Sequence, residues 1–246
     1  MPRKTIFVTS ALIVMSLLIS CDIARSESGV CRLDGIARVK QMHNYCGPAC
    51  MESVLRYFGK DINQAEIGKD VYDKSQAGTN GGDMVHYARK MGLSAYSWNS
   101  TLSDLKSKID AGIPVIVLQQ NSASDTSGHY RVLTGYDDHA KKCYVMDPYY
   151  DDVTEMDYDQ FDRFWRRMDR WALVIVPREK DIFSKELGAL NPVVHLDLSY
   201  AQYRRGDYVA AMSEAKQALA LQPRNGYARS LMLRIKDALR AKGAGR

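Results

Sequence analysis

The sequence predicts an α+β domain in which helices come before an antiparallel sheet, followed by a segment that is all helical. Three observations lead to this fold class. Apolar residues spaced by three or four positions dominate up to about residue 112, whereas short apolar runs typical of strands dominate residues 113–176. From about residue 181 the strand-like runs stop and helical spacing returns. Helices followed by strands in this order are typical of α+β domains.

The composition excludes few classes of protein. The chain has 246 residues, enough for one large domain or two small ones, and 46% of them are hydrophobic. The net charge of +5 is mild, and no basic stripe interleaved with aromatic residues indicates nucleic-acid binding. There is no H-E-x-x-H motif, no Cys/His set with zinc spacing and no phosphate-binding loop, so we expect no metal or cofactor.

The first residues predict an export signal. Arg3 and Lys4 precede an apolar stretch that ends in "LISC", which resembles the bacterial lipobox. We therefore expect residues 1–20 to be a lipoprotein signal peptide and Cys21 to be the lipid-modified first residue of the mature protein. That protein would be anchored to a membrane of the bacterial cell envelope, facing the periplasm or the exterior. A plain signal peptide or an uncleaved anchor is the alternative. Residues 21–37 are expected to form a polar tether.

The first expected helix covers residues 47–58. Its apolar positions recur every three or four residues, with Pro48 in the first turn and Gly59 after the last. A loop at 78–83 leads into a short helix around 84–91, and 93–98 has the composition of a strand. Thr101 and Asp104 form a plausible cap pair for a helix over 102–109.

Four strands are expected next, at residues 113–120, 129–136, 143–147 and 171–176. A polar loop at 121–128 separates the first two, and we expect it to be mobile. The turn at 137–142 makes the second and third strands a hairpin. We place the boundaries of this α+β domain at residues 38–178.

The C-terminal segment, residues 186–241, is expected to be a tetratricopeptide-repeat helical pair followed by one more helix. Six residues stand at the relative positions of that repeat: Leu198, Gly206, Tyr208, Ala211, Ala218 and Pro223. A single repeat does not bury a continuous face, so it must pack on the first domain, on a copy of itself or on a partner. We expect its deletion to change partner binding more than chemistry.

Cys46 stands at the start of the first expected helix. There the unpaired backbone N–H groups and the helix dipole favour a negative charge, which lowers the pKa of a thiol. Attack by a thiolate on an amide also needs a base, a group that orients the base, and donors to the oxyanion. A disulfide partner or a small core residue is the other interpretation of this cysteine. Cys31, Cys50 and Cys143 are the other cysteines after Cys21, and spacing alone does not pair them.

Three further residues meet the needs of a thiolate nucleophile. His129 begins one strand of the expected hairpin and Asp147 ends the other, so the two lie at the same edge of the sheet. Gln41 lies five residues before Cys46 and is a candidate, with the Cys46 backbone N–H, for an oxyanion hole. Cys50, four residues after Cys46, lies on the same helix face, where it either packs behind the site or takes part in a disulfide or redox gate.

The segments "QMHNYCGPA", "GHYRVLTGYD" and "DPY" together resemble family 39 of the cysteine peptidases, the bacteriocin-processing, double-glycine-leader type, which has a papain-like fold. The resemblance covers about residues 36–178. It implies Cys46 as nucleophile, His129 as base, Asp147 as the orienting group and Gln41 as oxyanion donor, acting on a peptide or protein substrate. Leader-processing members are fused to an ABC exporter, whereas this sequence has no membrane bundle and no nucleotide site. The resemblance therefore does not carry leader cleavage over.

The sequence as a whole predicts a membrane-anchored extracytoplasmic cysteine peptidase whose C-terminal repeat binds a partner or the substrate. Two alternatives use the same residues. A papain-like cleft that binds a peptide without cutting it would make the chain a scaffold, and transfer of the acyl group to an amine would make it an acyl transferase.

Overall fold

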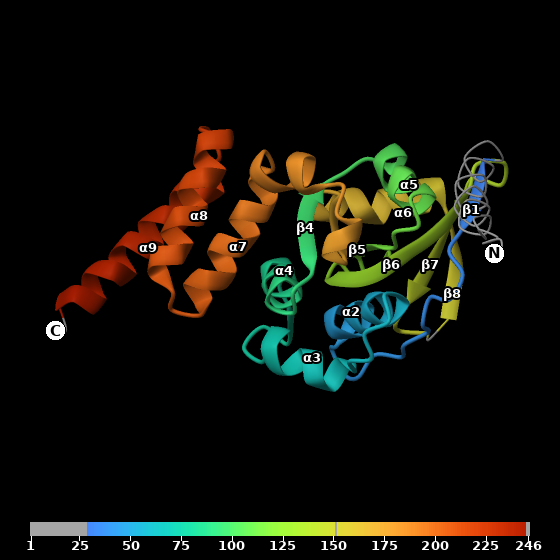
Figure 1. The fold of residues 1–246 in the computed structure, drawn as a ribbon, viewed down its shortest axis with the longest axis horizontal. Helices are drawn as coiled ribbons and strands as arrows, with labels where there is room; N and C mark the ends of the chain where they lie inside the picture. The colour runs from blue at the N-terminus through green and yellow to red at the C-terminus, as the bar shows by residue number, and fades with distance from the viewer. Residues whose placement is uncertain (1–28, 151, 245–246) are drawn as a thin grey trace, which may run out of the picture.

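The computed structural model describes residues 29–150 and 152–244, in which a seven-stranded antiparallel sheet forms the centre (Figure 1). Its strands are β1 (Val30–Arg32), β4 (Ser94–Asn99), β5 (Val115–Gln120), β6 (Gly128–Asp137), β7 (Lys142–Asp147), β8 (Asp152–Asp157) and β9 (Trp171–Val176). They lie in the order β4-β9-β5-β6-β7-β8. Strand β6 pairs with β7. It also pairs with β5 along its first part and with β1 along its last part. A separate ribbon is made of β2 (Tyr72–Asp73) and β3 (Gly78–Thr79).

Helices cover both faces of the sheet. The helices α2 (Cys46–Tyr57), α3 (Gln64–Val71) and α4 (Gly81–Lys90) pack on one face, and α5 (Leu102–Asp110) and α6 (Tyr158–Trp165) on the other. In β9, Leu173 and Ile175 face the first of these two cores, while Ala172 and Val174 face the second. Because both faces are buried, the inner strands have continuous apolar runs instead of an alternating pattern.

Most expected elements are confirmed within one or two residues, including α2 and the five expected strands. The backbone N–H of Asp104 donates to Thr101 Oγ1 (3.2 Å), so the predicted cap of α5 is present. Helix α3 and the strands β1, β2, β3 and β8 were not expected. Strand β8 is an outer strand with mostly polar residues, so it lacks an apolar signal.

The expected tether at 21–37 is wrong for its second half. Strand β1 pairs with β6, Cys31 is 2% exposed, and the Leu33 N–H donates to Thr134 O (2.8 Å). Three residues held mainly by backbone hydrogen bonds are too few to produce a period-two pattern, which explains the missed strand. Residues 1–20, Cys21 and the first part of the tether lie outside the described residues.

The C-terminal helices join the core of the sheet domain. They are α7 (Pro192–Arg204), α8 (Tyr208–Leu221) and α9 (Gly226–Ala244), preceded by the short turns η2 (Arg178–Lys180) and η3 (Ser184–Ala189). Helix α7 packs on α4 and β4, and α8 and α9 continue outward from it (Figure 1). Val194 and Leu198 of α7 belong to the same apolar core as α2 and α4. Of the three expected arrangements of this segment, the structure shows packing on the first domain.

Helices α4 and α7 approach each other very closely at Gly82. A Cβ atom at this position would lie 2.0 Å from the backbone oxygen of Asp197. Ion pairs flank this contact, because Arg204 and Arg205 both bind the Asp83 carboxylate, at 2.8 and 3.1 Å. The junction therefore combines close backbone packing with partly buried charge pairs.

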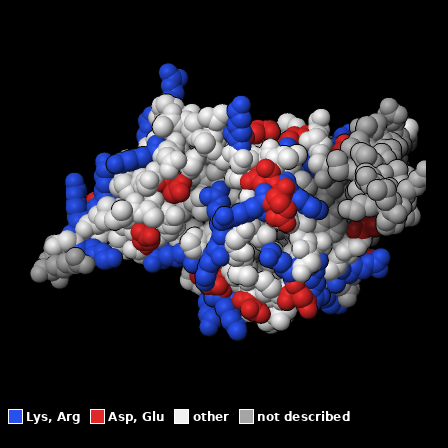
Figure 2. Space-filling model, viewed as in Figure 1, with Lys and Arg blue, Asp and Glu red and all other residues white. Residues whose placement is uncertain are grey.

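Charged side chains are distributed unevenly over the molecule. On the face seen in Figure 2, acidic and basic side chains mix over the sheet domain, while basic ones predominate along the C-terminal helices. From residue 207 to 244 the charged residues are Lys216, Arg224, Arg229, Arg234, Lys236, Arg240 and Lys242 against Asp207, Glu214 and Asp237.

Gly82→Ala should loosen the junction between α4 and α7. The added methyl group has no room against the Asp197 backbone, and overpacking of this kind costs about 1–3 kcal/mol. Gly226→Ala is the matched control, because a Cβ there meets nothing within 4 Å. Chemical denaturation measures the free energy of unfolding of both variants, and equal stabilities would contradict the close packing.

Candidate active site

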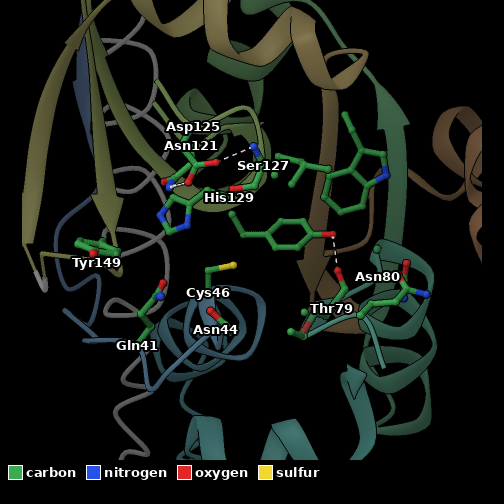
Figure 3. A pocket seen from close by; sticks show the side chains of 18 of the residues that line it. Gln41, Asn44, Cys46, Thr79, Asn80, Asn121, Asp125, Ser127, His129 and Tyr149 are labelled. Atoms are coloured by element: carbon green, nitrogen blue, oxygen red, sulfur yellow. Dashed lines mark hydrogen bonds between the residues drawn. The ribbon is translucent and has the colours of Figure 1, made fainter. Parts of the chain in front are cut away.

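A cavity of about 690 Å³ opens at the N-terminus of α2 (Figure 3). Most of its lining comes from four parts of the chain: residues 41–46, the β2–β3 ribbon and the turn after it (76–81), the loop 121–128 with the start of β6, and one residue of α7. Gln41, Cys46 and His129, which the sequence analysis singled out, all contribute to its walls.

The N-terminus of α2 carries no side-chain cap in the structure. Side chains cap α3, α5, α7 and α8 at the same position, whereas α4 and α6 also lack such a cap. A tight turn precedes α2, in which the Tyr45 N–H donates to Met42 O (3.0 Å) and Asn44 adopts a left-handed φ of 59°. The first-turn N–H groups beside Cys46 are therefore available to a negative charge.

His129 and Asp147 form a buried pair, as the expected hairpin predicted. His129 Nε2 lies 2.8 Å from Asp147 Oδ1, and the two side chains are 6% and 4% exposed. Because Nε2 faces the carboxylate, Nδ1 is the nitrogen left to face the Cys46 thiol. The structure thus brings together three residues that are separated by up to 101 positions in the chain, from Cys46 to Asp147.

Arg131 is a site residue that the sequence analysis missed. Its Nε donates to Asp147 Oδ2 (2.7 Å), and its other nitrogens donate to Gln119 Oε1 (3.3 Å) and Asn121 O (2.9 Å). Val132 lies opposite Met146, so continuing the register places Arg131 opposite Asp147. The available signal was an arginine in an otherwise buried strand, since such a residue needs a charged partner.

The three buried groups change each other's pKa. Burial by itself would raise the pKa of the Cys46 thiol, but the hydrogen bond and charge of His129, together with backbone hydrogen bonds at Tyr130 and Gly47, lower it. Burial would likewise lower the pKa of His129, but Asp147 and Cys46 raise it. Burial also opposes ionisation of Asp147, yet His129 and Arg131 hold the pKa of its carboxyl down at about 2. The arrangement therefore favours a thiolate beside an imidazolium.

Gln41 is held next to this group by its backbone. Its N–H donates to the carbonyl of Pro148 (2.8 Å), directly after Asp147. The side chain points to the cavity near Cys46 (Figure 3), and among the described residues its buried Oε1 has no hydrogen-bond partner. This oxygen is thus not used to hold the fold together. Gln41 stays a prediction for the oxyanion donor.

Tyr149 covers the His129–Asp147 pair from the solvent side. Its ring packs edge-on against His129, with centroids 6.4 Å apart, and its backbone N–H donates to Asp147 Oδ1 (2.9 Å). The side chain itself is 59% exposed, so it forms a rim of the cavity.

Cys50 behaves as a core residue in this structure. Its side chain is fully buried among α2, α3 and α4, and burial raises the pKa of its thiol well above the ordinary value. Cys143, whose pKa burial raises to about 12, lies in the opposite core across the sheet. Packing behind the site is therefore the interpretation of Cys50 that the structure favours over a redox gate.

Hydrogen bonds within the loop 121–128 give it a defined shape. Asp125 accepts from Asn121 Nδ2 (2.6 Å) and from the Ser127 N–H (2.9 Å), and the Asn121 N–H donates to Ser127 O (2.8 Å). The loop expected to be mobile is in this structure a closed turn on one wall of the cavity.

Across residues 29–150 and 152–244, no cluster of three or more His, Cys, Asp or Glu side chains has a geometry that would hold a metal ion. In the same ranges, no helix combines the length and apolar character needed to cross a membrane.

A helix-terminal thiol facing a histidine and an aspartate of an antiparallel sheet defines the cysteine peptidase-like class of fold. The chain belongs to the Peptidase C39 like family, whose model matches residues 33–173. No curated protein matches the sequence.

Two solved structures are similar to this chain. A putative C39-like peptidase from Bacillus anthracis is similar over 61% of this chain and 98% of its own, with a TM-score of 0.53 and 17% identity, which shows the fold. The peptidase domain of Streptococcus ComA, a bifunctional ABC transporter involved in quorum sensing, is similar over 57% of this chain and 97% of its own, at 25% identity and a TM-score of 0.49.

The thiol of Cys46 should be alkylated by iodoacetamide at a pH below the ordinary thiol pKa of about 8.5. His129→Ala should move the pH at which the alkylation rate is half-maximal upward, because it removes the hydrogen bond and charge that lower the thiol pKa. A rise of this pKa by about one lowers the thiolate fraction at neutral pH roughly tenfold. Mass spectrometry of the peptides resolves each cysteine, with buried Cys50 as the unreactive internal control. An unchanged midpoint in His129→Ala would contradict the pairing.

Proposed function

We propose that this protein is a cysteine peptidase that cleaves a peptide or protein substrate with Cys46 as its nucleophile. The single observation that carries the proposal is the thiol at an uncapped helix N-terminus beside the buried His129–Asp147 pair. A thiol in such a position is activated for attack on a carbonyl.

The reaction proceeds in two steps. The Cys46 thiolate attacks the scissile carbonyl, the oxyanion accepts hydrogen bonds from the α2 N-terminus and from Gln41, and His129 gives the thiol proton to the leaving amine. Water then attacks the thioester, with His129 taking its proton, and the acid product and free thiol are released. Asp147 holds the imidazole in the correct orientation through Nε2, and Arg131 in turn holds Asp147.

The chain carries two further parts with proposed roles. The helices α7 and α8 form a tetratricopeptide-like unit, because Gly206 turns the corner between them with a φ of 77°, and Ala211 and Ala218 allow close approach. This unit binds the substrate or a protein partner. Cys21 carries the lipid that anchors the protein to a bacterial membrane, outside the cytoplasm.

Cys46→Ala should abolish cleavage of a proteome-derived peptide library by the full-length protein in detergent, while leaving its circular dichroism unchanged. The site lies at a helix end on a cavity wall, so the loss of the sulfur does not open the core. Products are identified by mass spectrometry, which also separates hydrolysis from coupling to an added amine. Cleavage that persists in Cys46→Ala would rule out this nucleophile, and amine-coupled products alone would identify an acyl transferase.

Cys21→Ser should release the protein from the membrane fraction and prevent incorporation of labelled palmitate in bacteria, because this substitution removes the thiol that carries the lipid. Cys143→Ser, at a buried cysteine far along the chain, is the control for the substitution itself. Palmitate labelling that survives in Cys21→Ser would contradict the lipid anchor.

A further inference from the structure

A second cavity adjoins the first. It has a volume of about 910 Å³ and lies between the sheet domain and the C-terminal helices. Leu118, Trp171 and Asp197 line both cavities, so these three side chains form the junction between them. A peptide bound at Cys46 can therefore continue past this junction without leaving the protein surface.

The second cavity has the lining of an apolar binding site. Leu190, Pro192, Val193, Leu196 and Tyr227 supply its apolar wall. Leu190 is 65% exposed and Tyr227 is 53% exposed, which is unusual for large apolar side chains gathered in one hollow. Further apolar residues and a set of polar and charged ones, among them Arg167, Glu186 and Gln222, form the rest of the lining. An apolar core with polar groups around it fits a large apolar side chain of a peptide.

Helix α7 also fixes the junction itself. Asp197 Oδ2 accepts from Ser97 Oγ (2.6 Å) and from Trp171 Nε1 (2.8 Å), which sets the plane of the indole. The indole in turn packs against Tyr130, with ring centroids 5.6 Å apart, on the wall of the first cavity. The position of a side chain in the tail thus determines the shape of the cleft near Cys46.

A second set of contacts links α7 to another wall of the first cavity. Arg204 pairs with Asp73 of the β2–β3 ribbon as well as with Asp83. Gln76, in the same ribbon, donates to Tyr200 Oη (3.3 Å). Because residues 76–79 line the first cavity, α7 holds two of its walls in place.

We propose that the C-terminal helices form a substrate subsite of the peptidase. The substrate chain whose scissile carbonyl lies at Cys46 extends past Trp171 and Asp197 and places a large apolar side chain against Leu190, Leu196 and Tyr227. The occupant is the substrate itself and not a separate protein, because the two cavities share one junction. This inference rests on the proposed peptidase function. It assigns the preference for a large apolar side chain in the substrate to the second cavity.

The test uses random peptides that are long enough to span both cavities, each with one benzoylphenylalanine at a varied position. Irradiation with the full-length Cys46→Ala protein should crosslink peptides to residues 190–196 or to Tyr227. Wild-type protein should cleave the same peptides at a constant distance from the crosslinking position. Leu190→Glu should lower kcat/KM for these peptides roughly tenfold or more, because a charge replaces the apolar contact.

Leu233→Glu is the matched control, since this leucine is 61% exposed on α9 and lies outside both cavities. Equal kinetics of the two leucine variants would overturn the subsite. Cleavage by wild type with crosslinks confined to the first cavity would overturn it too and leave the peptidase function standing. Crosslinks in the second cavity without any cleavage would overturn the peptidase function and support the subsite as a peptide-binding groove. Neither crosslinks nor cleavage would overturn both.

Discussion

The site depends on one buried carboxylate. Asp147 is almost fully enclosed, and three donors compensate for its lost hydration: His129 Nε2, Arg131 Nε and the Tyr149 N–H. Removing one partner of such a buried pair costs about 3–5 kcal/mol, because the charge that stays behind is left uncompensated. Because Asp147 remains ionised, it raises the pKa of His129, and His129 lowers that of Cys46. Electrostatic control of the thiol therefore starts at Asp147 and reaches the sulfur through the imidazole.

The cleft is assembled from parts of the chain that are far apart in sequence. Helix α2 presents an uncapped end, and a missing cap costs about 0.5–2 kcal/mol of helix stability. Close packing offsets that cost: Gly47 has no room for a Cβ, which would lie 2.8 Å from the Thr79 side chain, so the β2–β3 ribbon lies directly against the helix. Helix α7 then holds the ribbon from the other side through Arg204. The β2–β3 ribbon thus packs against α2 and is itself held by α7.

Local sequence patterns were enough to find the residues that lie at the start of a helix or at the ends of a hairpin. Cys46 could be found because Gly-Pro marks a helix start, and His129 and Asp147 because a hairpin brings the ends of its two strands together. Arg131 and Asp197 could not, because their partners are set by register and by helix packing, which periodicity does not encode. Strand β1 was missed for a similar reason, because backbone hydrogen bonds to β6 hold it in place and these leave no side-chain pattern. Packing of the tail on the first domain was one of three expected arrangements, but its position was not predicted, because the sequence pattern gave no indication of the contact at Gly82.

The short distance along the chain between Cys21 and β1 would limit where a protein with a lipid on Cys21 can work. Eight residues lie between Cys21 and Val30, which are thus nine steps apart. A fully extended chain spans at most about 3.6 Å per residue, so a lipid on Cys21 would keep β1 within roughly 30 Å of the bilayer. Strand β1 lies at one end of the molecule and α9 at the other (Figure 1). Under such an anchor, the enzyme could not diffuse to its substrate, and substrates would have to come to the membrane surface.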